Sequence, residues 1–422
     1  MKIRINHLAK MEGHASFVGD IISTGHVQQA CVQTEEGSRL IEGILIGRHY
    51  SEAKTVTSRI CGVCPVVHYL TAMQAMERAL NITPREIDLI IRKLLEASQI
   101  IYSHALHMFF LSLPDFLNFD DDLKMAGKYP QETQIAIAIR QWAIDLQQIV
   151  AGRTIHPLSM EEGGMKKYPA KKELQVLLSR ADDVIAKTII LANFFAKLEY
   201  PKFSRETEFI ALGKKNEYAF YDGNLISNKK LNISEEKFYH HIEEIDRPYN
   251  LVKRTHWQGN PYFVGALARI NLNHQQLHAE AKNILNHAKI KLPNFNTFYN
   301  VLAQAIELVH FACEMKKQLK NIIANYKECD IKKNIKFKIK AGQGVGAIEA
   351  PRGTLFHYYE LDKNGYIIDC NIITPTAQFL ANLEADLKVH LPDTLKLSKA
   401  ERERRIKQLI RAYDPCISCA TH

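Results

Sequence analysis

The chain lacks several features that would place it in other protein classes. Its first residues mix apolar side chains with Lys, Arg, Asn, His and Glu, so they do not form the apolar run of a secretory signal. The most apolar stretches, 100–117 and 184–195, are interrupted well short of the about 18 clean residues that a membrane span needs. No stretch is dominated by Pro, Gly or Ser, and no internal repeat is found. We therefore expect a soluble, cytoplasmic, globular protein without a membrane span.

The charge pattern gives little support for nucleic-acid binding. The formal net charge is +9 for 422 residues, and much of the excess lies in the segments 315–340 and 396–411. These segments are typical of solvated helix faces, with an acidic partner surface as the alternative. They contain no aromatic-interleaved basic motif, so no nucleic-acid partner is expected.

Hydrophobic periodicity predicts a mainly helical α+β fold. We expect strands over 14–18 and 27–33, and a capping box at Thr83 with Pro84 as the first helical residue, opening a helix that continues to about 105. Further helices are expected over 132–150, 170–198, 274–288, 295–323 and 398–412. Between 335 and 373 the pattern changes to strands and turns, with a glycine-rich stretch at 342–346 and a turn at 362–365.

The same pattern predicts a single domain over residues 1–422, built around a long central helix bundle. A β-containing part would occupy about 1–60, the helical core about 65–330, and a second β-containing part with a metal-binding segment about 335–422. With 46% hydrophobic residues, the chain is long enough to bury such a core.

The eight cysteines indicate the class of chemistry. Cys61 and Cys64 form one C-x-x-C pair, and Cys416 and Cys419 form another near the opposite end of the chain. Without an export signal, such pairs favour metal ligands or redox dithiols over a disulfide framework. Four thiolates from the two ends can converge on one soft or borderline metal, and their spacing suits zinc and nickel alike.

The residues around these pairs are more specific than the cysteines themselves. Arg59-Ile60-Cys61-Gly62-Val63-Cys64 is followed by His68, and Asp414-Pro415-Cys416-Ile417-Ser418-Cys419 is followed by His422. These segments resemble the two signatures of nickel–iron hydrogenase large subunits. Further family elements are matched along the chain by 10–14, 39–42, 153–164, 349–353 and 373–376, with Lys10 and Met11 replacing the Arg and Ile of the first.

The resemblance implies a catalytic subunit that cleaves H2 reversibly into protons and electrons. In the family, one cysteine of each pair binds nickel terminally, which implies this role for Cys61 and Cys416. Cys64 and Cys419 would bridge nickel to an iron that carries carbon monoxide and two cyanides. Soft thiolate donors suit such a centre because they support changes in nickel oxidation state.

The resemblance also assigns roles to residues around the metals. Glu12 would accept the proton of split H2 beside Cys416, and such a carboxylate is a suitable relay group. Arg352 would lie over the open metal position and donate to one cyanide, Thr376 would donate to the other, and Pro351 would wall the diatomic ligands. Asp414 would hold Arg352 or a water in place. Read alone, Glu12 is a surface or cap acid and Asp414 a turn residue before Pro415.

Two histidines are implied as further site residues. His68 would donate a hydrogen bond to a bridging sulfur. His422 would join Glu42 and the backbone carbonyl of Ile372 around a magnesium or similar cation. The family's acid before the helix histidine is absent, because this chain has Ser103 before His104. That replacement leans towards the cytoplasmic multisubunit branches.

The chain shows no means of carrying electrons onward. Cys31, Cys313, Cys329 and Cys370 have no iron–sulfur spacing, and no G-x-G-x-x-G motif is present. We therefore expect the partner to be an iron–sulfur small subunit, with iron–sulfur clusters only there. The segments 265–269 and 411–413 look most like the NAD(P)-linked branch with flavin-containing diaphorase subunits.

Several alternatives stay open at this point. An enzyme serving a deazaflavin or heterodisulfide reductase, or a hydrogen sensor, would share the same catalytic core. From other classes, a structural protein with a four-cysteine zinc site and a quinone-site component of respiratory complex I are alternatives. The complex I protein normally lacks the four cysteines.

Overall fold

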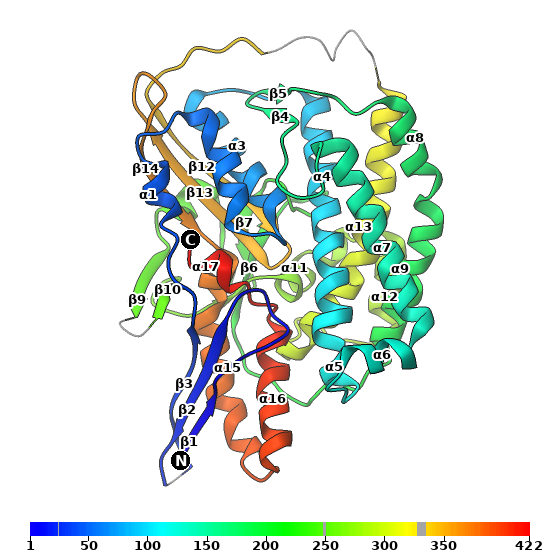
Figure 1. Ribbon diagram of the computed structural model, residues 1–422, viewed down its shortest axis with the longest axis vertical. Coiled ribbons are helices and arrows are strands. Elements are labelled where there is room, and N and C mark those ends of the chain that lie inside the picture. Colours follow the sequence, from blue (N-terminus) through cyan, green and yellow to red (C-terminus); the bar gives the residue numbers. More distant parts are fainter. Residues whose placement is uncertain (24, 248–249, 327–334) are drawn as a thin grey trace.

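Long helices form one half of the molecule in the computed structural model, which describes residues 1–23, 25–247, 250–326 and 335–422 (Figure 1). The bundle consists of α4 (Glu86–His104), α7 (Pro130–Ala151), α8 (Lys171–Ser179), α9 (Ala181–Ala196), α12 (Ala279–His287) and α13 (Asn300–Ala324). α4 and α13 pack directly against each other, and α9 packs on α13. The predicted mainly helical α+β class is confirmed, because the helices accompany several small sheets.

A three-stranded antiparallel sheet and a buried helix make up the neighbouring part (Figure 1). The sheet contains β12 (Gly342–Ala350), β13 (Gly353–Leu361) and β14 (Ile367–Ile373), and α3 (Pro65–Leu80) lies on β12. The glycine-rich stretch at 342–346 is the start of β12. A Cβ atom at Gly342, Gly344 or Gly346 would lie within 2.4 Å of a carbonyl oxygen of α3. Glycine therefore lets α3 approach the sheet closely.

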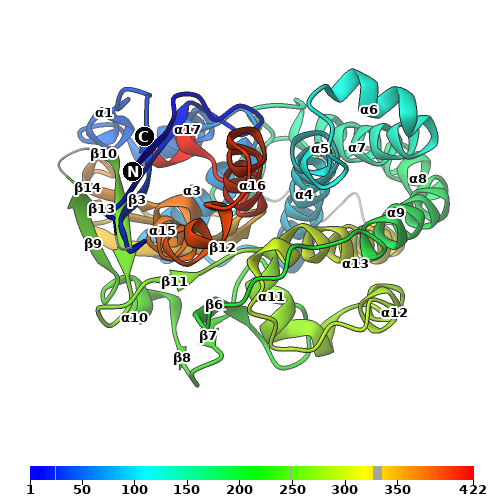
Figure 2. The ribbon, with the colours of Figure 1, turned by 90° about the horizontal axis from the view of Figure 1, so that it is seen from below.

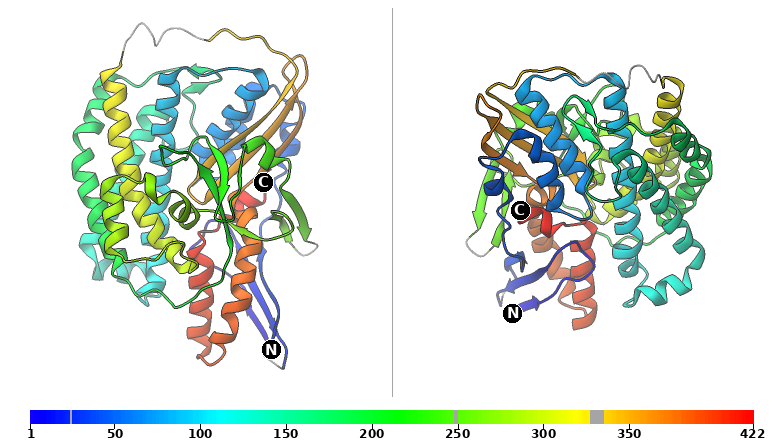
Figure 3. Two further views of the ribbon diagram at one scale, coloured as in Figure 1. Left: turned by 180° about the vertical axis from the view of Figure 1, so that it is seen from behind. Right: turned by 45° about the horizontal axis from the view of Figure 1, so that its top comes forward.

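An N-terminal sheet extends away from these parts beside two C-terminal helices (Figures 1 and 3). The strands β1 (Lys2–Ile5), β2 (Ala15–Ile21) and β3 (Val27–Thr34) are antiparallel, and α15 (Pro375–Thr394) packs on β3 and on α16 (Lys399–Ala412). β2 and β3 confirm the two strands predicted there. The loop between β1 and β2 returns to the last helix, α17 (Ile417–Ala420), so the chain ends meet near the middle of the molecule.

Shorter elements connect these parts, and Figure 2 shows them from below. They are α1 (Ile41–Leu45), η1 (Tyr50–Glu52), α2 (Ala53–Thr57), η2 (Ser58–Ile60), the π-helical η3 (Ala105–Ser112), α5 (Leu113–Phe116), α6 (Asp122–Lys128), β4 (Met160–Glu161), β5 (Gly164–Met165), β6 (Glu208–Gly213), β7 (Asn224–Ser227), β8 (Asn232–Ile233), α10 (Glu235–Tyr239), β9 (Glu243–Arg247), β10 (Asn250–His256), β11 (Tyr262–Phe263), α11 (Ala266–Asn273), η4 (His274–Gln276) and η5 (Thr297–Tyr299). The strand order of the central sheet is β11-β6-β7-β8.

Two predicted helices differ from the structure at their ends or middle. The capping box at Thr83 is wrong, because α4 begins at Glu86 and its N-cap is Arg85. The Arg85 guanidinium binds the carboxylate of Asp88 in the first turn, which supports the later start. The expected helix over 170–198 is two helices, because the amide of Arg180 bonds in a tighter turn to the Leu177 carbonyl.

Other boundaries moved less. The helix expected over 132–150 ends as predicted before Gly152, whose φ of 76° suits a helix C-terminus. The segment expected as a helix over 274–288 is η4 followed by α12, and the helix expected from 295 begins at Asn300 after η5. The last helix has Ser398 as its N-cap, and the turn at 362–365 is present. The helices α3, α11 and α15 were not predicted from the sequence.

The two predictions based on absences also have outcomes within the described ranges. No helix there is both long and apolar enough to cross a membrane. Cys31, Cys313 and Cys370 are buried and free, while Cys329 and the middle of the basic segment 315–340 lie outside the described residues.

Candidate metal centre

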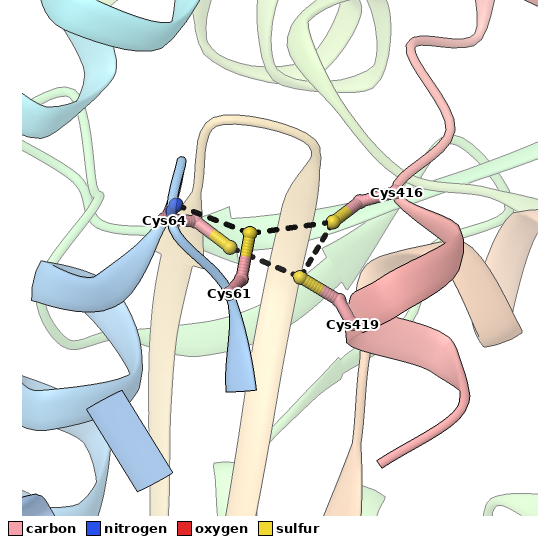
Figure 4. Close-up of side chains that lie close together, drawn as sticks. All are labelled: Cys61, Cys64, Cys416 and Cys419. Atoms are coloured by element: carbon pink, nitrogen blue, oxygen red, sulfur yellow. Dashed lines mark hydrogen bonds between the residues drawn. The ribbon is translucent and has the colours of Figure 1, made fainter. Parts of the chain in front are cut away.

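The four cysteines of the two C-x-x-C pairs meet at one buried point (Figure 4). Cys61 and Cys64 occupy the turn between η2 and α3, whose first residue is Pro65. Cys416 and Cys419 come from the other end of the chain, before and within α17. The sulfur atoms of Cys61 and Cys416 are 3.6 Å apart, those of Cys64 and Cys419 are 3.0 Å apart, and all four lie within 4.8 Å of one another. They form a four-sulfur ligand set.

The electrostatics of this cluster fit a bound metal ion. The Val63 and Cys64 amides at the start of α3 donate to the Cys61 sulfur. Contacts with the Cys416, Cys419 and Cys64 sulfurs hold the pKa of Cys61 well below that of a free thiol. Burial raises the pKa of Cys416 and Cys419 well above that value. Four buried thiols so close together can all ionise only beside a strong cation, which a divalent metal provides.

Two side chains hold the cysteine segments in place. The Nη2 of Arg39 donates to the Ile60 carbonyl at 2.6 Å and to the Ser418 carbonyl, so one guanidinium joins both segments. Gln99 of α4 donates to the Val63 carbonyl at 2.7 Å and accepts from the Val66 amide at 3.2 Å. Gln99 was not predicted from the sequence, because a lone glutamine about 35 residues away carries no motif.

Glu12 lies beside Cys416 through backbone pairing of the two chain ends. The carboxylate Oε2 is 3.4 Å from the Cys416 sulfur, and the Glu12 carbonyl accepts from the Ile417 amide at 2.9 Å. Gly13 allows this approach, because it has a φ of 84° and a Cβ there would lie 2.8 Å from the Ser418 nitrogen. Burial and the Cys61 thiolate raise the pKa of Glu12. This half-buried carboxyl is therefore suited to hold a proton.

Arg352 lies on the opposite side of Cys416 and is paired with Asp414. Its Nε donates to the Asp414 carbonyl at 2.7 Å, and its Nη2 lies 2.9 Å from the Asp414 carboxylate. Burial opposes the guanidinium charge, but Asp414 and the cysteine thiolates hold the pKa of Arg352 well above its usual range. Within the described ranges the buried Nη1 has no hydrogen-bond partner. A free buried donor of this kind fits an anionic ligand.

A small cavity beside the sulfurs is lined by Arg352, Pro351, Thr376 and His68 as well as by three of the cysteines. It leaves about 10 Å³ for the centre of a water-sized molecule, which is room for a diatomic molecule or a single water. The Thr376 hydroxyl accepts from the Cys416 amide at 3.0 Å, so its own hydrogen remains available to a ligand.

His68 is placed in the same cavity wall by α3. Its Nδ1 lies 3.1 Å from Nε2 of His357, and burial lowers the pKa of His68 to about 3, so the ring is neutral. Over the parts of the chain that the structure describes, no hydrogen bond joins His68 to a cysteine sulfur. Its expected bond to a bridging sulfur therefore stays a prediction.

The three residues expected around a second cation also converge. Nε2 of His422 lies 2.9 Å from the Ile372 carbonyl oxygen and 3.5 Å from a Glu42 carboxylate oxygen. Although burial opposes the charge of Glu42, its contacts with His422 and the Ile372 amide hold the pKa of Glu42 below its usual value. One carboxylate, one carbonyl and one imidazole are thus gathered beside the C-terminal cysteine segment.

The fold and the site define a buried thiolate metal centre built from both ends of one chain. The sequence pattern of the family "Nickel-dependent hydrogenase" matches residues 39–148 and 184–422. The chain is 30% identical over 426 residues to the alpha subunit of sulfhydrogenase 2 of Pyrococcus furiosus, covering 100% of this chain and 99% of that protein. It is 32% identical over 424 residues to the alpha subunit of sulfhydrogenase 1 of the same organism, covering 100% and 98%.

A solved structure agrees with these sequence relatives. The H2-reduced NAD+-reducing NiFe-hydrogenase superposes with a TM-score of 0.88 and 28% identity, covering 100% of this chain and 99% of that one. The chain therefore belongs to the nickel-dependent hydrogenase family as a large, catalytic subunit, and it is an oxidoreductase that acts on H2. This finding removes the zinc-stapled structural protein and the complex I protein from consideration.

Proposed function

We propose that the four cysteines hold a nickel–iron centre with Cys61 and Cys416 as terminal nickel ligands and Cys64 and Cys419 bridging to an iron that carries carbon monoxide and two cyanides. The observation that carries this proposal is the convergence of four buried sulfurs within 4.8 Å beside a cavity for a diatomic molecule. When bound, the centre supplies the redox-active position at which H2 is split into a proton and electrons.

Glu12 then takes the proton away from the site. The first base is the Cys416 sulfur or a group near Arg352, and Glu12 is the next acceptor because its Oε2 lies 3.4 Å from that sulfur. Its raised pKa supports this role, since a carboxyl that holds a proton closer to neutral pH can both accept and release it.

Arg352, Thr376 and Pro351 shape the cavity for the small ligands. The free Nη1 of Arg352 would donate to one cyanide and the hydroxyl of Thr376 to the other. Pro351 forms part of the wall, and Asp414 orients Arg352 through its carboxylate and its carbonyl. His68 would donate to a bridging sulfur from the ring nitrogen that does not face His357.

Glu42, Ile372 and His422 would bind a magnesium or similar cation that ties the C-terminal segment to α1 and β14. Magnesium prefers oxygen ligands, which Glu42 and the Ile372 carbonyl supply. Chelation of the cation should lower the melting temperature of the purified protein, and added magnesium should restore it. The same melting temperature with and without chelator would contradict this assignment.

The partner is proposed to be an iron–sulfur small subunit, with flavin-containing diaphorase subunits passing electrons to NAD(P) in the cytoplasm. The likeness to an NAD+-reducing hydrogenase supports NAD(P) as acceptor. A different acceptor is supported by the 29% identity to one component of the F420-non-reducing hydrogenase of Methanothermobacter thermautotrophicus. Assays of H2-dependent reduction of NAD+, NADP+ and coenzyme F420 by the purified complex would separate these acceptors.

The experiment that tests the centre itself is infrared spectroscopy of the purified protein under argon and under H2. Bands of iron-bound carbon monoxide and cyanide that shift with H2 are expected. A matched Cys419→Ser variant should lose these bands together with nickel. Stoichiometric zinc in the wild-type cysteine site, with no such bands after expression with the maturation machinery, would overturn the proposal.

A further inference from the structure

A buried hydrogen-bond chain continues from Asp414 away from the cysteines, and the proposed function does not use it. Asp414 Oδ2 accepts from Nε2 of Gln304 at 3.1 Å, and Oε1 of Gln304 lies 2.6 Å from Nδ1 of His107. The other ring nitrogen of His107, Nε2, lies 2.8 Å from the Arg411 carbonyl oxygen. All three side chains are at most 2% exposed, so water does not compete for these bonds.

The elements that carry this chain come from distant parts of the sequence. His107 lies in the π-helical segment η3 after α4, Gln304 lies in α13, and Asp414 lies two residues before Cys416. π-helical turns inside helices are frequent at functional sites, because they redirect side chains that a regular helix would place elsewhere. Here the turn directs the His107 ring between α13 and the C-terminal segment.

An inventory of donors and acceptors determines the hydrogens on His107. The Arg411 carbonyl can only accept, so Nε2 of His107 must carry a hydrogen. With the Gln304 amide oriented to donate to Asp414, its oxygen faces Nδ1, which must then carry a hydrogen as well. Both ring nitrogens donate in this arrangement, and a neutral imidazole has only one N–H.

The reversed orientation of the Gln304 amide is excluded by Asp414. Its oxygen would then face the Asp414 carboxylate oxygen at 3.1 Å, which places two acceptors together in a buried site. Asp414 stays ionised because Nη2 of Arg352 binds it at 2.9 Å. The carboxylate Oδ1 also lies 3.7 Å from Nε2 of His107, which favours positive charge on the ring.

The other charged groups around His107 are engaged elsewhere. The Arg411 guanidinium binds both oxygens of Asp115 and the Ala9 carbonyl. Glu307, one turn after Gln304 on α13, binds Arg269 and Nε2 of His104. The ionised group that remains for His107 is Asp414, with Arg352 on its far side.

The geometry points to His107 as an imidazolium that, through Gln304, acts as a positioning residue for Asp414 and thereby for Arg352. Asp414 would be held between two cations, Arg352 and His107, so that its carboxylate cannot turn away when Arg352 engages an anionic ligand. The inference rests on the proposed role of Arg352 for its functional half. Its protonation half stands on the hydrogen-bond geometry alone.

The protonation half is tested by NMR of the holoenzyme in complex with its partner subunits, grown with ring-¹⁵N-labelled histidine. Signals from two protonated ring nitrogens are expected for His107, assigned by their loss in the His107→Gln variant. The measurement does not depend on catalysis, so it can fail or succeed independently of the proposed function. One protonated and one bare nitrogen on His107 at neutral pH would overturn the inference.

The positioning half is tested by the Gln304→Met variant, which keeps the side-chain volume and removes both hydrogen bonds. We expect unchanged nickel content, shifted infrared bands of the iron ligands and about tenfold slower hydrogen–deuterium exchange, as for other partners that orient site residues. Gln318→Met is the control, because Gln318 lies on the same helix and binds Glu314 far from the cysteines. Band positions and exchange rates equal to those of the control would overturn the positioning role.

Discussion

The two sides of Cys416 differ in burial and in how they are held together. The Glu12 side, made of Glu12, Gly13 and Ser418, is half-buried and joined mainly by backbone contacts. The Arg352 side, made of Arg352, Asp414 and Pro351, is buried and joined by charged side chains. A proton needs a path to solvent and an anionic ligand needs a dry cationic wall. The difference therefore indicates that protons leave on the Glu12 side and that small ligands are held on the Arg352 side.

The difference also predicts how each side responds to substitution. Glu12 is positioned by its own backbone, so its carboxyl can be changed without moving the chain. Arg352 shares a buried ion pair with Asp414, so any change at Arg352 leaves part of a buried charge unpaired. The predictions below use this contrast, from the largest expected effect to the smallest.

Replacing Glu12 by Gln should produce the largest loss of activity. The amide cannot relay a proton, so hydrogen–deuterium exchange should fall by about 10²- to 10⁴-fold. Nickel content and the infrared bands of the iron ligands should be unchanged, because the backbone bridge to Cys416 remains. Glu12→Asp, which keeps the carboxyl on a shorter side chain, should lose less. Equal exchange in wild type and Glu12→Gln would remove Glu12 from the proton path.

On the other side, Arg352→Lys should reduce H2 oxidation by about 10- to 100-fold. Lysine keeps the charge but cannot bind Asp414 with two nitrogens and still present a free donor to the cavity. The infrared bands of cyanide should shift in this variant, in contrast to Glu12→Gln. Unshifted bands would show that Arg352 does not contact the ligand set.

Gly13→Ala tests the backbone contact on the Glu12 side. Its φ of 84° and the 2.8 Å approach of a Cβ to the Ser418 nitrogen should destabilise the protein by roughly 2–4 kcal/mol. The melting temperature should fall, whereas Gly37→Ala, where a Cβ meets nothing within 4 Å, should change it little. A similar melting temperature for both variants would mean that the chain ends do not approach as closely as described.

Thr376→Val should have the smallest effect of the four. It removes the acceptor of the buried Cys416 amide and should cost about 1–3 kcal/mol of stability. Thr376→Ser keeps the hydroxyl and is the matched control. If urea denaturation finds valine and serine variants equally stable, the Thr376 hydroxyl does not hold the Cys416 segment.

The sequence predicted the fold class, most helix positions and the metal class for identifiable reasons. The spacing of apolar residues in α7 and α16 and the glycine after α7 mark those helices directly. The two C-x-x-C segments with their flanking residues are specific enough to indicate the family. Thr83 failed as a cap because the competing pair of Arg85 and Asp88 depends on local three-dimensional contacts. α3 and α15 were not predicted, because both are buried on most of their faces and lack a clear amphipathic period.

By itself, the sequence determined which chemistry this chain can perform, because four cysteines and their flanking motifs limit the metal and the reaction. It also carried the glycines that allow close approach at Gly13 and along β12, although their purpose is visible only in contact with Ser418 and α3. Tertiary structure decided which polar side chains serve the site. Gln99, Gln304 and His107 have no local signature, and they act on the cysteine segments because folding brings α4, α13 and the C-terminus together in a buried space where each hydrogen bond must find its partner.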